Sequence, residues 1–490
     1  MTLPSYSFIF IFLPIVVILY YLFNSKKIYL GGKIVLLAAS LIFYFSMGWQ
    51  GFIGLLVSIA LCYLIATFGL SAQRSVHTRK TFLVLGIVIN VFFLLYCKYL
   101  SYFELLINKY SGSNLSFTAI VLPVGISYFT FSQIAYLVDS YRNPDLKYSI
   151  LDYALFVSFF PKVTVGPIAL STEMIPQFND ITRKNINYTL LAKGFYRFTL
   201  GLSKKLLIAD NLSLFVDLCF TNYGVLGTTN ALLASVSYTL QIYFDFSGYC
   251  DIAIGICEML GLELIDNFDA PYKAISISDF WKRWHISLTR FFRTYIYIPL
   301  GGNRKGKFRT YLNTMIIFLI SGLWHGSATT FVVWGAVHGL GSIISKIIAP
   351  IMNKVPKFIR WFLTFSFVNL AWILFRAPDL ETAMAIYEQL FTGGFKPINI
   401  DIIAACIPPE GQLIQWIVLK YAKAYTYYSG CTIMLAVMGI GLLLCTLTKT
   451  AASRVASFSP TKLKVVTTVI LFVWSVLSLS QVSEFIYVNF

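Results

Sequence analysis

Long apolar runs recur along almost the whole chain and are separated by short polar or basic connections. The first run extends from Phe8 to Phe23, and a later one covers about residues 82 to 100. About 20 apolar residues are enough to cross the ~30 Å hydrocarbon core of a membrane as a helix. A crossing segment must satisfy its own backbone hydrogen bonds, so these runs indicate helices. We therefore predict an all-α, polytopic transmembrane protein with about ten to twelve spans.

The pattern becomes irregular after residue 150. The sequences Phe159-Phe160-Pro161-Lys162 and Gly166-Pro167 interrupt an apolar stretch with helix breakers and a charge. Such breaks are tolerated at membrane depth only where protein or a wet cavity covers them, which predicts re-entrant segments. Further spans are expected at residues 229–246, 248–264, 311–323, 328–348, 361–376, 430–447 and 464–480.

Basic residues alternate between the early connections. Lys26 and Lys27 follow the first run, the connection Gly48–Gly51 has no basic residue, and Arg74 and Arg79 follow the third run. Cytoplasmic loops carry an excess of Lys and Arg, so this alternation places the N-terminus outside. The first run has no basic segment before it and no small-residue cleavage site, so we interpret it as a retained span.

The composition agrees with a membrane protein, because 58% of the residues are hydrophobic and only 12% are charged. Soluble domains carry about 25% charged residues. The net charge of +17 would suggest nucleic acid in a soluble protein. Here basic loops explain it, and no long basic loop with interleaved aromatic residues offers a nucleic-acid surface. We expect membrane lipids, and not nucleic acid, around this chain.

The segment Ser278–Tyr295 has aromatic and aliphatic residues at helical spacing on one side and basic residues on the other. This pattern predicts an interfacial helix. From Lys273 to Arg309 nine Lys or Arg stand against one acid, Asp279. One interpretation is an ordinary cytoplasmic loop. The other is a surface for an anionic donor such as a coenzyme A thioester, with these candidate residues: Arg290, Arg293, Arg304 and Lys305.

Two of the four histidines are candidates for chemistry. His325 follows an apolar run that begins near Ile316, and ionisable residues near or inside a bilayer are functional candidates. The alternative is a satisfied core histidine between helices. His285 lies on the flank of the predicted interfacial helix, where it could face a cavity mouth. His77 lies in a short basic loop and is expected to be solvated.

His338 follows His325 by thirteen positions. On an unbroken helix the two would be about 20 Å apart along the axis. They could share a site only if the helix broke, for example at Gly326 or Gly335, so we interpret His338 as structural. The histidines and the eight cysteines show no ligand spacing, so we predict no metal site and no disulfide frame.

Four motifs follow one another in a fixed order: Phe244-Asp245-Phe246-Ser247-Gly248-Tyr249-Cys250-Asp251, Asp279-Phe280-Trp281-Lys282-Arg283-Trp284-His285, Pro299-Leu300-Gly301-Gly302-Asn303 and Gly322-Leu323-Trp324-His325-Gly326. With Leu122–Phe131 upstream and Trp372–Ala377 downstream, they resemble the membrane-bound O-acyltransferase family. The resemblance covers about residues 120 to 377. It is strongest to the branch of alginate O-acetyltransferases, which includes enzymes that acetylate cellulose and peptidoglycan.

The resemblance implies one integral membrane domain over residues 1–490 with a central tunnel. Its N-terminal spans would be residues 1–118, its family core 119–377 and its C-terminal spans 378–490. His325 matches the histidine that the family places in a buried tunnel, and His285 matches its second polar position. Cys250 departs from the family pattern, in which serine is common at this position.

These matches imply an acetyltransferase mechanism. His325 would be the base for the acceptor hydroxyl, and His285 would orient the donor on the cytoplasmic side. Further residues are expected to wall the tunnel or position groups in it: Trp281, Arg283, Trp284, Trp324, Asp245, Ser247 and Asn303.

The resemblance also implies where the reaction takes place. We expect a bacterial cytoplasmic (inner) membrane enzyme with no permanently bound cofactor. It would take acetyl-CoA or another acyl thioester from the cytoplasm and serve O-acetylation of an extracytoplasmic polysaccharide. A periplasmic or surface acyltransferase is the expected partner protein. Two alternatives stay open: D-alanyl transfer to teichoic acid from a carrier-protein thioester, and a transporter or flippase of a cell-envelope precursor.

Overall fold

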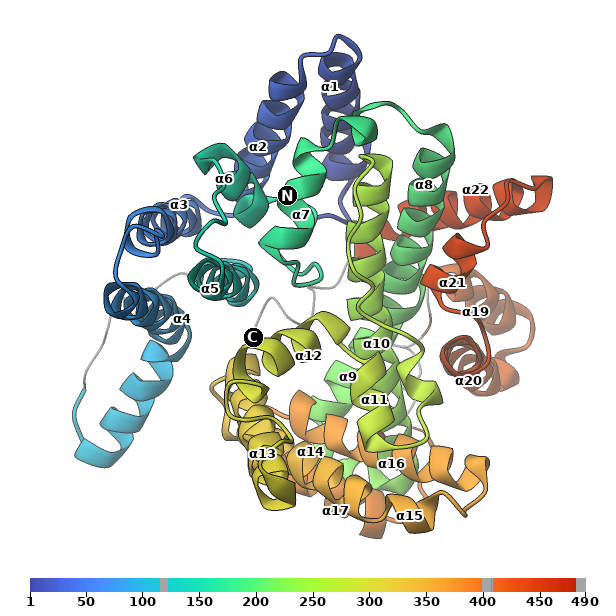
Figure 1. Cartoon of the computed structure of the whole chain (residues 1–490). Helices are drawn as coiled ribbons and strands as arrows, with labels where there is room; N and C mark the ends of the chain where they lie inside the picture. Colours follow the sequence, from blue (N-terminus) through green and yellow to red (C-terminus); the bar gives the residue numbers. More distant parts are fainter. Residues whose placement is uncertain (115–121, 399–406, 408, 482–490) are drawn as a thin grey trace. The chain divides into compact units, whose positions relative to one another are not determined.

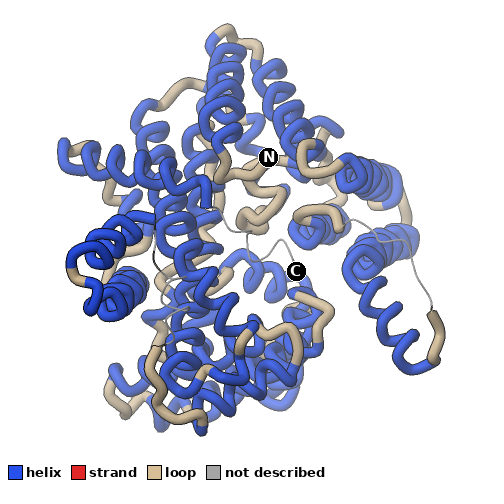
Figure 2. The backbone as a smooth tube through the Cα atoms, turned by 180° about the vertical axis from the view of Figure 1, so that it is seen from behind, coloured by secondary structure: helices blue, strands red, loops and turns tan. Residues whose placement is uncertain are grey.

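The computed structural model describes residues 1–114, 122–398, 407 and 409–481. The described residues form helices and no strand, as the tube in Figure 2 shows, and Phe268 and Trp284 form one isolated bridge. The predicted all-α class is confirmed. The expected boundary at residue 118 and Cys406, one of the eight cysteines, lie outside the described residues, and the division into three segments stays a prediction.

The first compact unit consists of Met1–Phe198, Ile252–Asp266 and Arg290–Ile296. Its helices (Figure 1) are η1 (Phe8–Phe12), α1 (Leu13–Ser25), α2 (Tyr29–Phe45), α3 (Trp49–Leu64), η2 (Ile65–Gly69), α4 (Val76–Ser111), α5 (Ile126–Arg142), α6 (Ile150–Ser158), α7 (Ser171–Asn179) and η3 (Ile181–Lys184).

The second unit consists of Thr199–Asp251, Asn267–Thr289 and Tyr297–Phe490. Its helices are η4 (Lys205–Ala209), α9 (Asp210–Thr221), η5 (Tyr223–Val225), η6 (Pro271–Lys273), α11 (Ile277–Arg283), α13 (Gly306–His325), α14 (Thr329–Ile347), α15 (Ala349–Met352), α16 (Lys357–Arg376), α17 (Leu380–Thr392), α19 (Pro409–Tyr421), η8 (Lys423–Tyr425), α20 (Thr426–Thr446), α21 (Ala451–Ala456), α22 (Lys462–Leu477) and η9 (Ser478–Gln481). Four helices contribute residues to both units: α8 (Tyr188–Lys204), α10 (Gly227–Met259), α12 (Ile286–Phe292) and η7 (Arg293–Tyr297).

Six segments of the described chain are long and apolar enough to cross a membrane: Phe8–Ser25, Trp49–Gly69, Val76–Leu100, Thr329–Ile347, Lys357–Arg376 and Lys423–Thr446. Less than half of each segment is buried inside the protein, which leaves apolar surface for lipid. The chain is therefore a multi-pass membrane protein. Tyr29–Phe45 is a shorter apolar helix, and a total of ten to twelve spans stays a prediction.

Helix α10 differs from the sequence prediction. We predicted two spans, at residues 229–246 and 248–264, but one helix runs from Gly227 to Met259 over 33 residues, which is about 50 Å. Gly248 does not break it. A Cβ atom there would lie 2.9 Å from the carbonyl oxygen of Gly201 on α8. Gly248 therefore permits close helix packing, a role that sequence alone does not separate from a helix break.

The predicted interruption after residue 150 is present. Helix α6 ends at Ser158, and residues 159–169 are irregular and buried. The amide of Phe160 donates to the hydroxyl of Ser40 at 3.1 Å, and the Lys162 ammonium lies 4.3 Å from the centre of the Phe156 ring. Protein covers this irregular backbone, as the sequence pattern required.

Candidate active site

The segment that carries His285 is not one helix, and our prediction of a continuous helix from Ser278 to Tyr295 is wrong. Helix α11 ends at Arg283, and α12 begins at Ile286. His285 between them has a left-handed backbone, with φ of 47°. The break arises because an earlier segment takes over the hydrogen bonds of the helix. The Asp269 amide donates to the Arg283 carbonyl, and the Ile286 amide to the Asn267 carbonyl, both at 3.0 Å.

Asn267 holds the imidazole of His285 and was missed by the sequence analysis. Its side-chain oxygen accepts from the amide of Ser287 at 3.0 Å and from the Ser287 hydroxyl at 2.9 Å. The same oxygen lies 3.2 Å from Nδ1 of His285. On its other side the Asn267 amide group donates to the sulfur of Cys250 at 3.4 Å. The departure at Cys250 therefore lies directly behind the residue that positions His285.

These contacts fix the tautomer of His285. A backbone amide can only donate, so the Asn267 atom that it meets is the oxygen, and Nδ1 of His285 must carry the proton. The other ring nitrogen, Nε2, is left as an acceptor and has no hydrogen-bond partner among the described residues. Burial lowers the pKa of His285 to about 3, so the ring stays neutral near pH 7.

His325 ends a helix and lies at the turn of a helical hairpin. Helix α13 stops at His325, Gly326 is extended, and α14 begins at Thr329. The two helices lie side by side (Figure 1). Two glycines allow this contact. A Cβ at Gly322 would lie 2.3 Å from the Phe331 oxygen, and one at Gly335 would lie 2.4 Å from the Phe318 oxygen.

Aromatic rings enclose the buried imidazole of His325. Its ring centre lies 4.7 Å from that of Trp324, 5.2 Å from that of Trp334 and 5.0 Å from that of Phe375. Trp334 and Phe375 were not candidates from sequence, although the motif Trp372–Ala377, which contains Phe375, was recognised. The enclosure excludes bulk water, a condition that favours a neutral base and protects a reactive acyl group.

Trp324 connects the two candidate histidines, because its ring also lies 6.1 Å from that of His285. His338 joins the same ring system, 4.9 Å from Trp334. The break at Gly326 makes this approach possible. The indole of Trp281 donates to Nδ1 of His338 at 3.2 Å. Its other ring nitrogen, Nε2, has no hydrogen-bond partner among the described residues, as in His285, so the structural role of His338 stays a prediction.

The chain matches the family model described as MBOAT, membrane-bound O-acyltransferase family, over residues 42–384. It belongs to the membrane-bound O-acyltransferase family. The match includes both candidate histidines and the rings around them. The chain is therefore an O-acyltransferase.

Individual relatives agree with the family assignment. The peptidoglycan O-acetyltransferase of Helicobacter pylori is 39% identical over 413 residues, which are 78% of each chain. The probable alginate O-acetylase of Pseudomonas aeruginosa is 37% identical over 405 residues, 80% of this chain and 75% of that protein. The teichoic acid D-alanyltransferase of Bacillus subtilis is more distant, at 29% over 229 residues, 44% of this chain and 57% of that protein.

Asp245, expected in the tunnel of this O-acyltransferase, belongs to a buried ion network. The Lys205 ammonium lies 2.8 Å from Oδ1 of Asp245 and 2.7 Å from Oδ1 of Asp210, and all three side chains are buried. Removing one member of such a group costs about 3–5 kcal/mol, because a charge is left buried without compensation. The geometry therefore favours a structural task for Asp245 in holding α10 against η4 and α9.

The other predicted wall residues lie in different surroundings. Ser247 is buried on α10, whereas Asn303 is exposed on the loop before α13. Trp284 is buried and packs on Trp372, with ring centres 5.0 Å apart. Trp281 packs on His338 at 5.0 Å. Of the three predicted wall tryptophans, Trp324 is the one whose ring contacts with both His285 and His325 are established.

The basic candidates divide into paired and exposed residues. Both oxygens of Glu173 accept from Arg290, at 2.5 and 3.0 Å. Nε of Arg283 donates to Asp279 at 2.9 Å. Arg293, Arg304 and Lys305 are exposed. The exposed residues are therefore better placed than Arg290 to meet an anion from solution.

Proposed function

We propose that this O-acyltransferase takes an acetyl group from a cytoplasmic thioester and passes it across the membrane for O-acetylation of an extracytoplasmic polysaccharide. The observation that carries the proposal is the ring-enclosed pair His285 and His325, which share contacts with Trp324. The names of the relatives, which act on peptidoglycan and alginate, support the acceptor class.

The reaction needs one proton acceptor and one leaving group. The acceptor hydroxyl gives its proton to the imidazole of His325 while its oxygen forms a bond to the acyl carbon. The carbon–sulfur bond of the thioester breaks, and the proton then passes from the imidazolium to the leaving thiolate. The open Nε2 of His285 is suited to hold the donor. The rings around His325 limit hydrolysis of the thioester.

The membrane gives the reaction its direction. The alternating basic loops support an N-terminus outside, and the bacterial relatives support a location in the bacterial inner membrane. A tunnel that leads to His325 from both faces would let the acyl group cross without its carrier. Arg293, Arg304 and Lys305 would bind donor phosphates on the cytoplasmic side. A separate periplasmic or surface acyltransferase would complete transfer to the sugar.

The proposal is tested by replacing His325 with alanine in the full-length protein. Mass spectrometry would measure O-acetyl groups on the surface glycans of cells that carry the wild type, His325→Ala, the control His77→Ala, or no copy. His77 is an exposed histidine at the start of α4. We expect acetylation to fall by about 10²–10⁴-fold in His325→Ala and to persist in His77→Ala. Wild-type acetylation by His325→Ala, at equal protein level, overturns the proposal.

Donor exchange separates the two acyl-transfer hypotheses. Purified enzyme is supplied with acetyl-CoA or with a D-alanyl carrier protein, and acyl consumption is followed. Preference for acetyl-CoA supports the proposal, whereas use of the carrier protein alone assigns the chain to D-alanyl transfer. Substrate movement across vesicles that persists in His325→Ala would instead indicate a transporter.

A further inference from the structure

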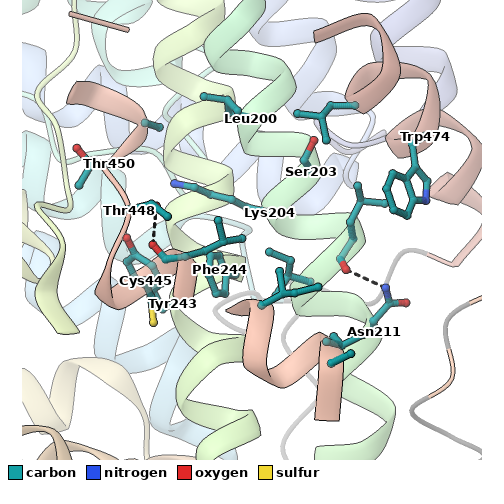
Figure 3. A pocket seen from close by; sticks show the side chains of 18 of the residues that line it. Leu200, Ser203, Lys204, Asn211, Tyr243, Phe244, Cys445, Thr448, Thr450 and Trp474 are labelled. Carbon is teal, nitrogen blue, oxygen red and sulfur yellow. Dashed lines mark hydrogen bonds between the residues drawn. The ribbon is translucent and has the colours of Figure 1, made fainter. Parts of the chain in front are cut away.

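A pocket of about 680 Å³ lies within the second unit, separate from the rings around the two histidines. Helices α8, α10, α20 and α22 contribute its walls (Figure 3). Two hydrogen bonds join elements at the pocket: the first connects η6 with the residues that follow α20, and the second connects α8 with α22. The Lys273 ammonium donates to the Thr448 carbonyl at 2.7 Å, and the hydroxyls of Ser203 and Ser475 lie 3.2 Å apart. A volume of this size is typical of small-molecule sites.

The long wall of the pocket is apolar and follows one face of α20. Ile433, Val437, Ile440 and Leu444 line it, at spacings that put them on the same side of a helix. These eleven steps rise about 16 Å, which is about half of the ~30 Å hydrocarbon core. The wall therefore matches the depth of one lipid leaflet.

The rim of the pocket is basic. Lys449 lines it three residues after α20 ends at Thr446, and Arg454 lines it from α21. Lys204 also lines the pocket (Figure 3), but its ammonium lies 2.6 Å from the Asp251 carboxylate and is neutralised. The residues that line the pocket include no Asp or Glu. Positive charge thus stands at the end of a membrane span, at the level of lipid headgroups, above an apolar wall.

We propose that this pocket binds one anionic phospholipid, with its phosphate on Lys449 and Arg454 and an acyl chain along α20. The charge at the rim selects an anionic headgroup, and the length of the wall selects a membrane lipid over a soluble phosphate compound. Basic residues at the membrane surface attract anionic lipids, which are enriched in the cytoplasmic leaflet. The site is independent of the acyl-transfer chemistry.

The rim is tested by native mass spectrometry of the full-length protein, purified in detergent and mixed with phosphatidylglycerol or phosphatidylcholine. The variant Lys449→Gln/Arg454→Gln removes the rim charge. Its control, Lys462→Gln/Lys464→Gln, removes two charges from the next helix that do not line the pocket. We expect wild type and control to retain phosphatidylglycerol. The rim variant should retain it at least about tenfold more weakly.

The wall is tested by Val437→Trp, which fills the pocket, against Val473→Trp on the exposed side of α22. Only Val437→Trp should lose the lipid. Glycerophosphoglycerol, the headgroup without acyl chains, should not displace it. Four outcomes each overturn the proposal. The protein retains both lipids equally, or the rim and wall variants retain the lipid as the wild type does. Alternatively, the headgroup displaces the lipid, or detergent is the sole bound species.

Discussion

At the scale of single residues, the state of His285 is set by an amide 18 positions earlier in the chain. The oxygen of Asn267 serves three donors, two from Ser287 and one from His285. A buried donor that loses its acceptor costs about 1–3 kcal/mol. Asn267 is therefore a positioning residue for His285, and its effect should be visible in turnover.

We expect Asn267→Ala to lower kcat about tenfold or more and to raise KM for the donor, because His285 holds the donor and loses the bond that fixes its tautomer. Asn267→Asp keeps the acceptor and adds a negative charge 3.2 Å from Nδ1. That charge raises the pKa of His285. As the pH is lowered, turnover by Asn267→Asp should therefore begin to fall at a higher pH than turnover by the wild type.

The control for this pair is Ser287→Ala, which leaves the contact between Asn267 and His285 in place. Steady-state kinetics across pH 5 to 9 would check both variants. Wild-type kcat in Asn267→Ala, together with an unshifted profile in Asn267→Asp, would show that the amide has no part in turnover.

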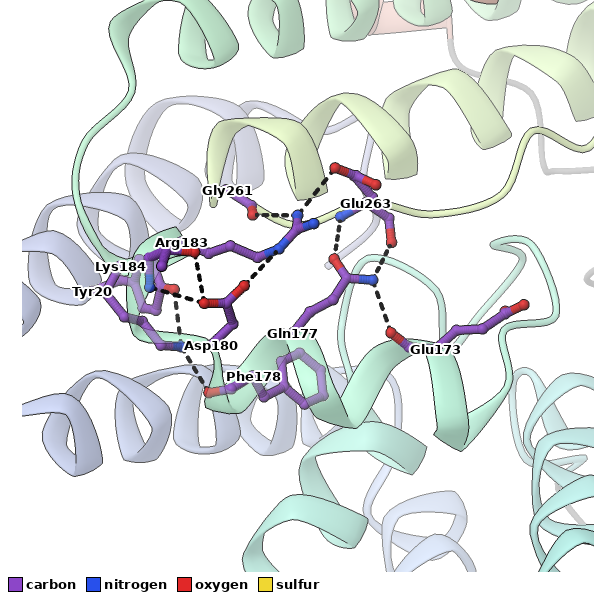
Figure 4. A network of polar contacts seen from close by, with 10 residues as sticks. Tyr20, Glu173, Gln177, Phe178, Asp180, Arg183, Lys184, Gly261 and Glu263 are labelled. Carbon is purple, nitrogen blue, oxygen red and sulfur yellow. Dashed lines mark hydrogen bonds and ion pairs between the residues drawn. The ribbon is translucent and has the colours of Figure 1, made fainter.

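A second residue-scale prediction concerns Lys184, buried in the polar network of Figure 4. Its ammonium donates to the Phe178 carbonyl at 2.8 Å. Burial, and then the charge of Lys33, lowers the pKa of Lys184 to about 8. Between pH 8 and the unfolded value near 10.4, the unfolded chain binds a proton that the folded protein does not. Stability from this group therefore rises with pH in that window.

We expect the unfolding temperature of the wild type, relative to Lys184→Met, to rise as pH increases from 7.5 to 10. Thermal unfolding in detergent would measure both proteins across this range. Since the difference between them isolates Lys184 from other titrating groups, a difference that is flat or falls with pH contradicts the lowered pKa.

At the scale of elements, the sequence predicted where helices exist better than where they bend or stop. Long apolar runs identified α14 and α16, and the helix breakers after residue 150 identified the buried irregular segment. The break at His285 could not be predicted, because its hydrogen bonds come from Asn267 and Asp269 on another segment. Gly248 and Gly326 look alike in sequence, yet the first packs a helix and the second ends one.

The hairpin of α13 and α14 gives an element-scale prediction. Gly322→Ala or Gly335→Ala puts a methyl group within 2.4 Å of a backbone oxygen on the facing helix. Overpacking of this kind costs about 1–3 kcal/mol and would separate the helices that place His325. We expect a lower unfolding temperature and reduced acyl transfer in both variants.

Gly439→Ala on α20 is the matched control, because a Cβ at that position meets no atom within 4 Å. Alanine there should be neutral or slightly stabilising, since glycine is a poor helix former. Thermal unfolding and acyl-transfer assays on the three variants would measure whether the close glycine contacts are needed for stability and activity. Equal stability of all three would mean that the close contact is not needed to hold the hairpin.

At the scale of the whole molecule, the excess of 38 basic over 21 acidic residues has two candidate uses, membrane topology and the proposed binding of an anionic donor. Sequence could not separate these uses. The structure assigns Arg290 to Glu173 and leaves Arg293, Arg304 and Lys305 exposed. Similarly, the family motifs located both histidines. The contacts of these histidines with Trp334, Phe375 and Asn267 depend on tertiary packing, so they could not be predicted from the sequence.

The exposed basic residues predict how the donor binds. Arg304→Glu/Lys305→Glu should raise KM for acetyl-CoA about tenfold and leave kcat unchanged, at about 0.5–1 kcal/mol for each exposed charge. KM for an acetyl thioester without nucleotide or phosphates should not change. Lys26→Glu/Arg74→Glu, in other exposed basic loops, is the control. Equal KM effects on both thioesters would rule out phosphate recognition by this loop.

The enclosure of His325 has a consequence for the order of assembly during synthesis. Three of its ring contacts come from Trp324, Trp334 and Phe375, which lie within about fifty residues of one another in the chain. Chains fold from the N-terminus as they leave the ribosome. These three rings can pack around the imidazole as soon as α16 has been synthesised. The proposed lipid pocket can form only at the end of translation, because α20 and α22 contribute its walls.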